Sequence, residues 1–274
     1  MKGILKQNKK LKDITSQVTE VAQYLWERGW AEHIAGNISV NINDLIVGEL
    51  DDVTNFPISR LPDSYPNLAN KYFLVTGTGR RMCDLARWPK KNLLIIKISE
   101  DGESYYIFTL NKKDVPELKP TSELATHLSI HNKIAHRGSK EKVIIHTHAT
   151  ELIALTHCQD IKSKQLINNI IWGMHPEVLM FIPKGIGFVP YTIPGSVDIA
   201  SKTLKEFKDH DVVLWEKHGV FAIGENVIDT FNSIDIVSKS AKIWFMCKQA
   251  GFEPEGLTNE QLIELKKNYT LQKK

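Results

Sequence analysis

The sequence has almost no excess of charge of either sign. Its 35 lysine and arginine residues are nearly balanced by 32 aspartate and glutamate residues, so the formal net charge is +3. Because the basic residues are scattered along the chain instead of clustered, nothing marks a surface for a nucleic acid. We therefore expect no nucleic-acid partner.

Cysteines and long hydrophobic runs are also scarce. Cys83, Cys158 and Cys247 stand far apart and form no Cys-x-x-Cys pair, which is typical of reduced thiols in a cytoplasmic protein. No stretch approaches the length of a transmembrane helix, and residues 1–10 lack the apolar run of a signal peptide. The sequence predicts a cytoplasmic protein without a membrane partner.

What the chain does contain is ordinary for a globular protein, with 42% hydrophobic and 24% charged residues in 274 positions. A chain of this length can bury a sizeable core without disulfides. Strand-like and helical patterns mix from end to end, and no repeat or clear linker interrupts them. We predict an α/β fold: a single domain over residues 1–274, with a central, mostly antiparallel or mixed β-sheet flanked by helices.

The positions of the elements follow from hydrophobic spacing, turn residues and caps. The expected strands cover 37–43, 72–77, 92–99, 105–108, 143–149, 177–183 and two runs within 212–224. The expected helices run from Asp13 to Arg28 and over 121–138, 150–157, 196–207 and about 226–250, with a last helix from about 257. Asp101-Gly102 suggests a hairpin, Thr258 and Gln261 have capping-box spacing, and residues 44–70 are expected to be irregular.

Two histidines end one of the expected strands, in the stretch "VIIHTHAT" (143–150). On a strand, residues i and i+2 point to the same face, so His146 and His148 are expected to stand side by side. Two imidazoles on one rigid face can chelate a metal, and catalytic zinc sites usually take three protein ligands. A His-x-His pair alone is a weak signal, because exposed or hydrogen-bonded histidines are the commoner explanation of such a pair.

A third metal ligand would have to come from elsewhere in the chain. His218 is the best candidate, because it follows the strand-like run "DVVLWEK" and precedes Gly219. His127, His131 and His136 lie on an expected helix, where histidines at the surface or in helix packing are the commoner finding.

Glu123 stands at the first turn of that same helix, just before the strand with the two histidines. Two interpretations remain open for it. The carboxylate either complements the helix dipole or a capping box, or it is a general base beside the metal.

Short loops at strand ends and a helix start offer backbone N–H groups and hydroxyls to an anion. The residues concerned are Gly36, Asn37, Thr78, Gly79, Thr121 and Ser122. Most glycine-rich turns only reverse the direction of the chain, so each loop alone is weak evidence for an anion site. Together with a strand that carries candidate metal ligands, they suggest a site in which a metal binds one end of a substrate and these loops bind a phosphate at the other end.

Six motifs occur in the order seen in the class II aldolase/adducin superfamily. They are "AGNIS", "LVTGTG", "PTSELATH", "VIIHTHATELIAL", "FIPKGIGFVPYTIPGS" and "LWEKHGVFAIG". The resemblance runs from about residue 13 to 265, and within the superfamily the chain most resembles the rhamnulose-1-phosphate aldolase family. The long segment between "TGTG" and "PTSE" favours this family over the shorter fuculose-phosphate aldolases and pentulose-phosphate epimerases.

The resemblance implies a zinc ion held by His146, His148 and His218, with Glu123 as the acid/base. It implies phosphate contacts from Asn37, Thr78, Thr121 and Ser122, through loop amides and hydroxyls. Glu177 matches an acidic residue that, in the family, reaches the aldehyde side of a neighbouring subunit's site. The family is typically a fourfold-symmetric homotetramer that acts on a ketose 1-phosphate.

The reaction that the resemblance implies is the reversible cleavage of L-rhamnulose 1-phosphate to dihydroxyacetone phosphate and L-lactaldehyde. One departure bears on the ketose: the family's loop is commonly Asn-Gly-Gly-Asn, whereas this chain has Ile34 in place of the first asparagine. Alternatives are a fuculose-phosphate type of aldolase, a 4-epimerase or dehydratase of the same superfamily, and an adducin-like interaction module without catalysis.

Overall fold

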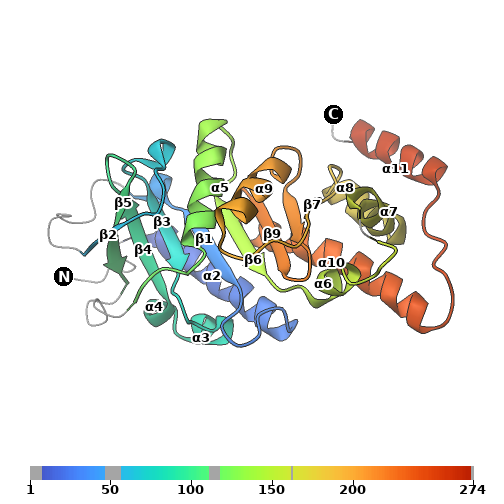
Figure 1. Ribbon diagram of the computed structural model, residues 1–274, viewed down its shortest axis with the longest axis horizontal. Helices are drawn as coiled ribbons and strands as arrows, with labels where there is room; N and C mark the ends of the chain where they lie inside the picture. The colour runs from blue at the N-terminus through green and yellow to red at the C-terminus, as the bar shows by residue number, and fades with distance from the viewer. Residues whose placement is uncertain (1–7, 47–56, 111–117, 162, 273–274) are drawn as a thin grey trace. The chain divides into compact units, whose positions relative to one another are not determined.

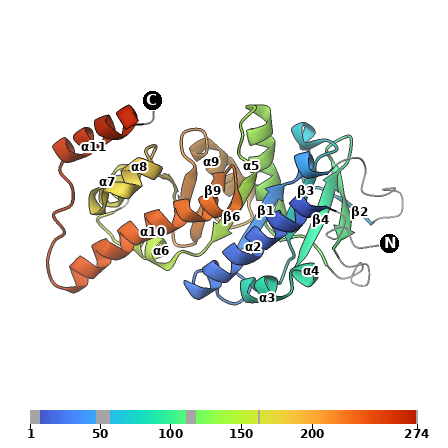
Figure 2. The same ribbon diagram turned by 180° about the vertical axis from the view of Figure 1, so that it is seen from behind.

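The computed structural model describes residues 8–46, 57–110, 118–161 and 163–272. The chain forms two compact units, drawn in Figures 1 and 2. The first unit comprises the described residues up to Thr147 together with Ile223–Thr230, and the second comprises His148–Ala222 and the described residues from Phe231 onward.

The first unit is built on an antiparallel sheet. Its strands are β1 (Asn37–Asn41), β2 (Ile58–Arg60), β3 (Tyr72–Thr76), β4 (Leu93–Ile98), β5 (Ser104–Thr109) and β6 (Val143–Thr147). They lie in the order β2-β5-β4-β3-β1-β6, and every neighbouring pair is antiparallel. The register sets Asn37 opposite His146 and Ser39 opposite both Val75 and Ile144.

Helices cover both faces of this sheet. They are α2 (Lys9–Glu27), α3 (Met82–Arg87), α4 (Pro89–Asn92) and α5 (Leu124–His136), with short 3-10 turns η1 (Asn43–Leu45) and η3 (Pro66–Leu68). Figures 1 and 2 show α2 and α5 on opposite faces. Since side chains alternate along a strand, β3 supplies Phe73 and Val75 to the core under α5, which also contains Leu128, and Leu74 to the other face.

The second unit contains three strands and most of the remaining helices. Strands β7 (Gly187–Val189) and β8 (Val212–Trp215) are parallel, whereas β8 and β9 (Gly219–Gly224) are antiparallel. The helices are α6 (Thr150–Leu155), α7 (Lys164–Met174), α8 (Pro176–Phe181), α9 (Val197–Glu206), α10 (Val227–Gln249) and α11 (Asn259–Gln272). Residues at the end of β9 and the start of α10 belong to the first unit.

The predicted fold class, a mixed and mostly antiparallel sheet flanked by helices in an α/β protein, is confirmed. The hairpin at Asp101-Gly102 joins β4 to β5, and Gly102 has the positive φ of 73° that such a turn requires. The capping box is present, since Thr258 and Gln261 exchange hydrogen bonds of 2.8 and 3.2 Å. The prediction of one domain over residues 1–274 stays a prediction.

Several predicted boundaries are wrong. The first helix begins at Lys9, because the side chain of Asn8, not Asp13, caps it by accepting from the Leu11 N–H at 3.0 Å. Helix α5 begins at Leu124, three residues later than expected. Residues 44–70 contain β2 and two 3-10 turns, and residues 47–56 of that range lie outside the described part of the chain.

The strand expected at 177–183 is wrong as well, because Pro176–Phe181 forms helix α8. A short apolar run does not distinguish a buried strand from a buried helix, and Pro176 at the first helical position favours the helix. Helix α7, which Ser163 caps, and strand β7 were not expected at all.

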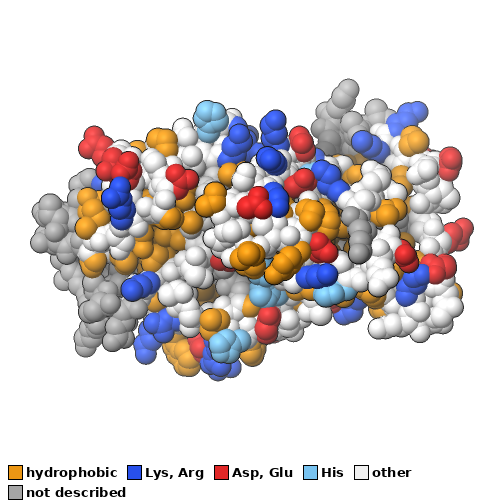
Figure 3. Space-filling view, in the orientation of Figure 1, with side chains coloured by type: hydrophobic (Ala, Val, Ile, Leu, Met, Phe, Trp, Pro, Cys, Tyr) orange, Lys and Arg blue, Asp and Glu red, His pale blue; other side chains and the backbone are white. Residues whose placement is uncertain are grey.

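The distribution of charged side chains and the hydropathy of the helices bear on whether a nucleic acid or a membrane could be a partner. On the face shown in Figure 3, lysine and arginine side chains are interspersed with aspartate and glutamate side chains and gather in no large patch of one sign. Among the described residues, no helix combines the length and the hydropathy needed to span a bilayer.

Candidate metal centre

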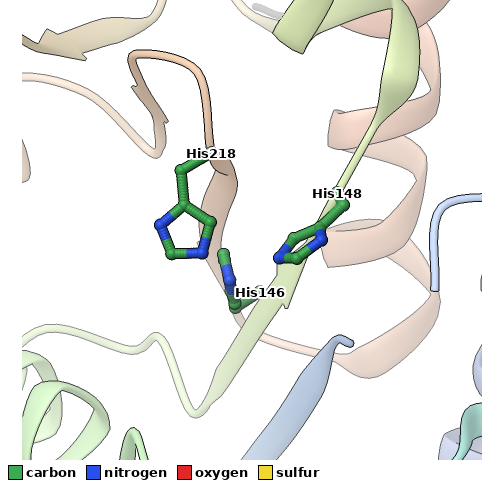
Figure 4. Close-up of side chains that lie close together, drawn as sticks. All are labelled: His146, His148 and His218. Carbon is green, nitrogen blue, oxygen red and sulfur yellow. The ribbon is translucent and has the colours of Figure 1, made fainter. Parts of the chain in front are cut away.

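Three histidines bring their ring nitrogens together, as Figure 4 shows. His146 is the fourth residue of β6, His148 follows one residue after that strand ends, and His218 directly precedes β9. One ligand atom from each ring lies within 4.8 Å of the others. The spacing of two residues along an extended chain turns His146 and His148 the same way, as the sequence predicted.

The turn between β8 and β9 directs His218 toward this group. Lys217 adopts a positive φ of 59°, which is uncommon for a residue with a side chain, and its N–H donates to the Thr156 hydroxyl at 2.9 Å. The rings of His218 and His148 meet edge to face at 5.1 Å, and the Trp215 ring supports His218 at 5.2 Å. Trp215 is in turn held by Thr203, whose hydroxyl accepts from the indole N–H at 2.8 Å.

Three imidazoles are a donor set that suits a divalent transition metal. Neutral imidazole nitrogen is a common ligand for zinc, copper, iron and nickel, whereas calcium and magnesium take oxygen ligands. His146 is buried and the other two histidines are partly buried, so the group is shielded from solvent on one side. Three protein ligands leave coordination positions open for a substrate, as in catalytic zinc sites.

Glu123 lies beside the histidine group. Its carboxylate Oε2 is 3.6 Å from His146 Nε2 and accepts a hydrogen bond of 2.6 Å from Asn37 Nδ2. Although Glu123 occupies the N-cap position of α5, its side chain caps no backbone N–H there. The Glu123 side chain is therefore directed toward Asn37 and His146 and not toward the backbone of the helix start.

The segments proposed for phosphate meet at the same edge of the sheet. Thr121 N–H donates to Thr76 O at 2.9 Å and Thr78 N–H donates to Lys119 O at 2.8 Å, which joins the loop after β3 to the segment before α5. Gly36 has a φ of 83°, and a Cβ there would lie 3.4 Å from the carbonyl oxygen of His146. Thr78, Gly79 and Ser122 are exposed, whereas Asn37 and Thr121 are buried. Of these residues, Gly36 and Asn37 lie beside the candidate metal ligand His146.

Glu177 is the second residue of helix α8. It occupies the first turn of α8, its side chain is 55% exposed, and its Oε2 is 2.8 Å from His175 Nδ1. The hydrogen bond from His175 lowers the pKa of the Glu177 carboxyl. Within the described residues, Glu177 is not part of the group that could hold a metal.

Sequence reasoning missed a set of buried polar residues behind Glu123. Ser39, His127 and His131 are all at most 2% exposed and are hydrogen-bonded to one another through the Ser39 hydroxyl. The signal was present in the sequence: Glu123, His127 and His131 are spaced by four, so they share one face of a helix. Nothing in the spacing showed that this face would be buried.

Comparison with known proteins agrees with this geometry. The family profile described as "Class II Aldolase and Adducin N-terminal domain" matches residues 16–245. A rhamnulose-1-phosphate aldolase of Bacteroides thetaiotaomicron is 43% identical over 276 residues, covering 100% of both chains. One of Yersinia pseudotuberculosis is 35% identical over 248 residues, covering 88% of each. The crystal structure of a sugar-phosphate aldolase from Thermotoga maritima superposes with a TM-score of 0.75 at 31% identity, covering 90% of this chain and 99% of that one.

The chain therefore belongs to the class II aldolase and adducin family. The resemblance seen in the sequence motifs is confirmed, and with it the expectation of a lyase. Class II aldolases depend on a metal ion, and the three-histidine group is where the described residues could hold one.

We predict that His218→Ala weakens the binding of a divalent metal by at least about 100-fold, since even residues that only support a metal ligand contribute roughly 10- to 100-fold. Competition with a chromophoric chelator measures the affinity. His157→Ala, which alters an exposed histidine outside the group, is the matched control and should bind like the wild type. Equal affinities in His218→Ala and the wild type would exclude His218 as a ligand.

Proposed function

We propose that this protein is a zinc-dependent aldolase that reversibly cleaves L-rhamnulose 1-phosphate to dihydroxyacetone phosphate and L-lactaldehyde. The observation that carries the proposal is the position of the Glu123 carboxylate. It lies 3.6 Å from His146, which belongs to a group of three histidines that could hold a metal. We infer the substrate from the 43% identity, over the full length of the chain, to a rhamnulose-1-phosphate aldolase. We infer zinc because it favours three imidazoles with an open position.

The cleaved bond joins C3 and C4 of the ketose, and its electrons remain on C3. Zinc, when bound by His146, His148 and His218, supplies a Lewis acid that stabilises the resulting negative charge. A base removes the proton from the C4 hydroxyl, and an acid delivers a proton to C3. Glu123 carries out the transfer at C3, because its carboxylate is beside the metal ligands and only 16% exposed. No lysine needs to form a Schiff base.

We propose that the loops near Asn37, Thr78 and Thr121 bind the phosphate end of the substrate. They combine the exposed hydroxyl of Thr78 with the N-terminal end of α5, and helix N-termini are where anions bind. Gly36 and Gly79, both with positive φ, let the backbone come close to a ligand. Ser122 adds a hydroxyl at the N-terminus of α5. Fixing the phosphate would orient C3 toward Glu123.

The identity of the ketose rests on the loop before β1. Ile34 is 49% exposed and lies in a turn that the Ala35 N–H closes onto Glu32 O at 2.8 Å. An isoleucine there offers no hydrogen bond to a hydroxyl of the substrate. The second candidate substrate is therefore a related ketose 1-phosphate, which the same histidines and Glu123 would cleave. Epimerase or dehydratase chemistry would reuse the same metal and phosphate groups, whereas an interaction module would have no use for Glu123 beside three histidines.

We predict that the protein cleaves L-rhamnulose 1-phosphate faster than L-fuculose 1-phosphate. It should also cleave it at least about 100-fold faster than free L-rhamnulose, which would yield unphosphorylated dihydroxyacetone, since remote phosphate binding contributes to orientation. A coupled assay with an NADH-dependent dehydrogenase that reduces L-lactaldehyde follows the product that all three ketoses release. A strong chelator should abolish the activity and zinc should restore it. Full activity in metal-free protein, or no product from any ketose 1-phosphate, would contradict the proposal.

We propose further that the working unit is a homotetramer in which Glu177 acts at the site of a neighbouring subunit. Its exposed side chain and its ionised form, which the hydrogen bond from His175 favours, support a role at a surface that another subunit covers. Closed symmetry would repeat such a contact at every site. A cytoplasmic location stays a prediction.

Mixing two inactive variants tests this role of Glu177. Glu123→Gln and Glu177→Ala each disable a different residue, so hybrid rings contain some sites with both native residues. We expect subunit exchange to restore part of the cleavage activity, measured by the same coupled assay. Mass spectrometry of the intact assemblies verifies the exchange. If hybrids form and remain inactive, Glu177 does not act across an interface.

A further inference from the structure

A thread of buried hydrogen bonds leads from the middle of α5 to Glu123. His131 Nε2 lies 2.9 Å from Ser39 Oγ, and Ser39 Oγ lies 2.6 Å from His127 Nδ1. His127 Nε2 contacts Asn37 Oδ1, and Asn37 Nδ2 lies 2.6 Å from Glu123 Oε2. The five residues come from β1, α5 and the residue that precedes α5. All belong to the first unit.

Glu123, the last residue of this thread, determines which atom donates and which accepts in the hydrogen bonds that lead to it. An ionised carboxylate can only accept, so the Asn37 atom that faces Glu123 must be the amide nitrogen. The Asn37 oxygen then faces His127 and can only accept, which requires a proton on His127 Nε2.

The remaining two bonds follow from the charge of the histidines. Burial lowers the pKa of His127 to about 3 and lowers that of His131 well below its usual value, so both rings are neutral near pH 7. A neutral His127 with its proton on Nε2 must accept at Nδ1, and the Ser39 hydroxyl therefore donates to it. Since the one Ser39 hydrogen is used there, Ser39 Oγ accepts from His131, whose proton is also on Nε2.

We propose that Ser39, His127 and His131 are positioning residues that lock the Asn37 amide in one orientation and thereby hold the Glu123 carboxylate beside the metal ligands. The assignment of a catalytic purpose rests on the proposed function, whereas the direction of the hydrogen bonds does not. Four bonds that all run toward Glu123 leave the Asn37 amide no alternative orientation while the carboxylate is charged.

The surroundings distinguish this thread from ordinary packing. Ser39 points to the same face of the sheet as Val75 and Ile144, and the ring of Phe73 packs on His131 at 4.8 Å. Buried polar groups in such an apolar layer are costly unless each is hydrogen-bonded. Here the bonds lead to a partly exposed carboxylate at the candidate metal centre, so the polar residues serve that centre.

Neutron diffraction from crystals of the full-length protein exchanged into D₂O tests the direction of the bonds. We expect deuterium on Nε2 of both His127 and His131, none on their Nδ1 atoms, and the Asn37 ND₂ group facing Glu123. Deuterium on Nδ1 of His127, or the Asn37 oxygen facing Glu123, would overturn the proposal. This result does not depend on what reaction the protein catalyses.

Kinetics with three variants tests the purpose of the thread. Ser39→Ala and His127→Phe break it, so we expect kcat to fall at least about tenfold while KM changes less than about threefold, because small misplacements of a reacting group slow chemistry more than they weaken binding. His127→Gln keeps a donor near the Nε2 position and should recover part of kcat. Metal content should match that of the wild type in all three.

A matched control separates positioning from lost stability. Ser240→Ala removes another buried serine hydroxyl, which donates to the Ile171 carbonyl at 2.9 Å far from this thread in the sequence. Its kcat should equal that of the wild type. If Ser39→Ala behaves like Ser240→Ala, the thread is structural only and the proposal fails. A wild type without any aldolase activity would instead contradict the proposed function, and the diffraction result alone would then decide the direction of the bonds.

Discussion

The pairing of β1 with β6 is the constraint on which the rest of the site depends. It sets Asn37 opposite His146, and because side chains alternate along a strand, this register turns both toward α5. A slip of one residue would point His146 to the opposite face and remove Asn37 from Glu123. The same register places Ser39 under His127 and His131. One strand pair thus places a candidate metal ligand, the hydrogen-bond partner of the Glu123 carboxylate, and Ser39, which is hydrogen-bonded to His127 and His131.

The site combines two kinds of support with different physical origins. Rigid backbone positions the histidines: two lie at the end of β6 and one follows a tight turn held by Lys217 and Thr156. Glu123, by contrast, stands at a helix start and is oriented by a hydrogen bond from Asn37. The Glu123 carboxylate lies 3.6 Å from His146 Nε2, so it would stand beside a metal that the three histidines held. Burial lowers the pKa of His127 and of His131, so these two histidines behind Glu123 are neutral near pH 7.

The sequence predicted those features that depend on local periodicity. The spacing of His146 and His148 predicted their shared orientation, and the strand before His218 indicated the third member of the group. The hairpin at Gly102 and the cap at Thr258 were equally local. The strand expected at 177–183 was wrong, because six apolar-rich residues fit a helix as well as a strand. The buried thread could not be predicted, since the burial of His127 and His131 depends on how α5 packs on β1.

In the reaction that we propose, Glu123 moves a proton at the carbon next to the ketone, beside a metal held by three histidines. Exchange of hydrogen between dihydroxyacetone phosphate and D₂O, followed by NMR without any aldehyde, isolates that step. We predict that the zinc-loaded protein incorporates deuterium stereospecifically at C3, and that Glu123→Gln with full zinc content does so at least about 100-fold more slowly. Exchange at the wild-type rate in Glu123→Gln, or none in the zinc-loaded wild type, would contradict it.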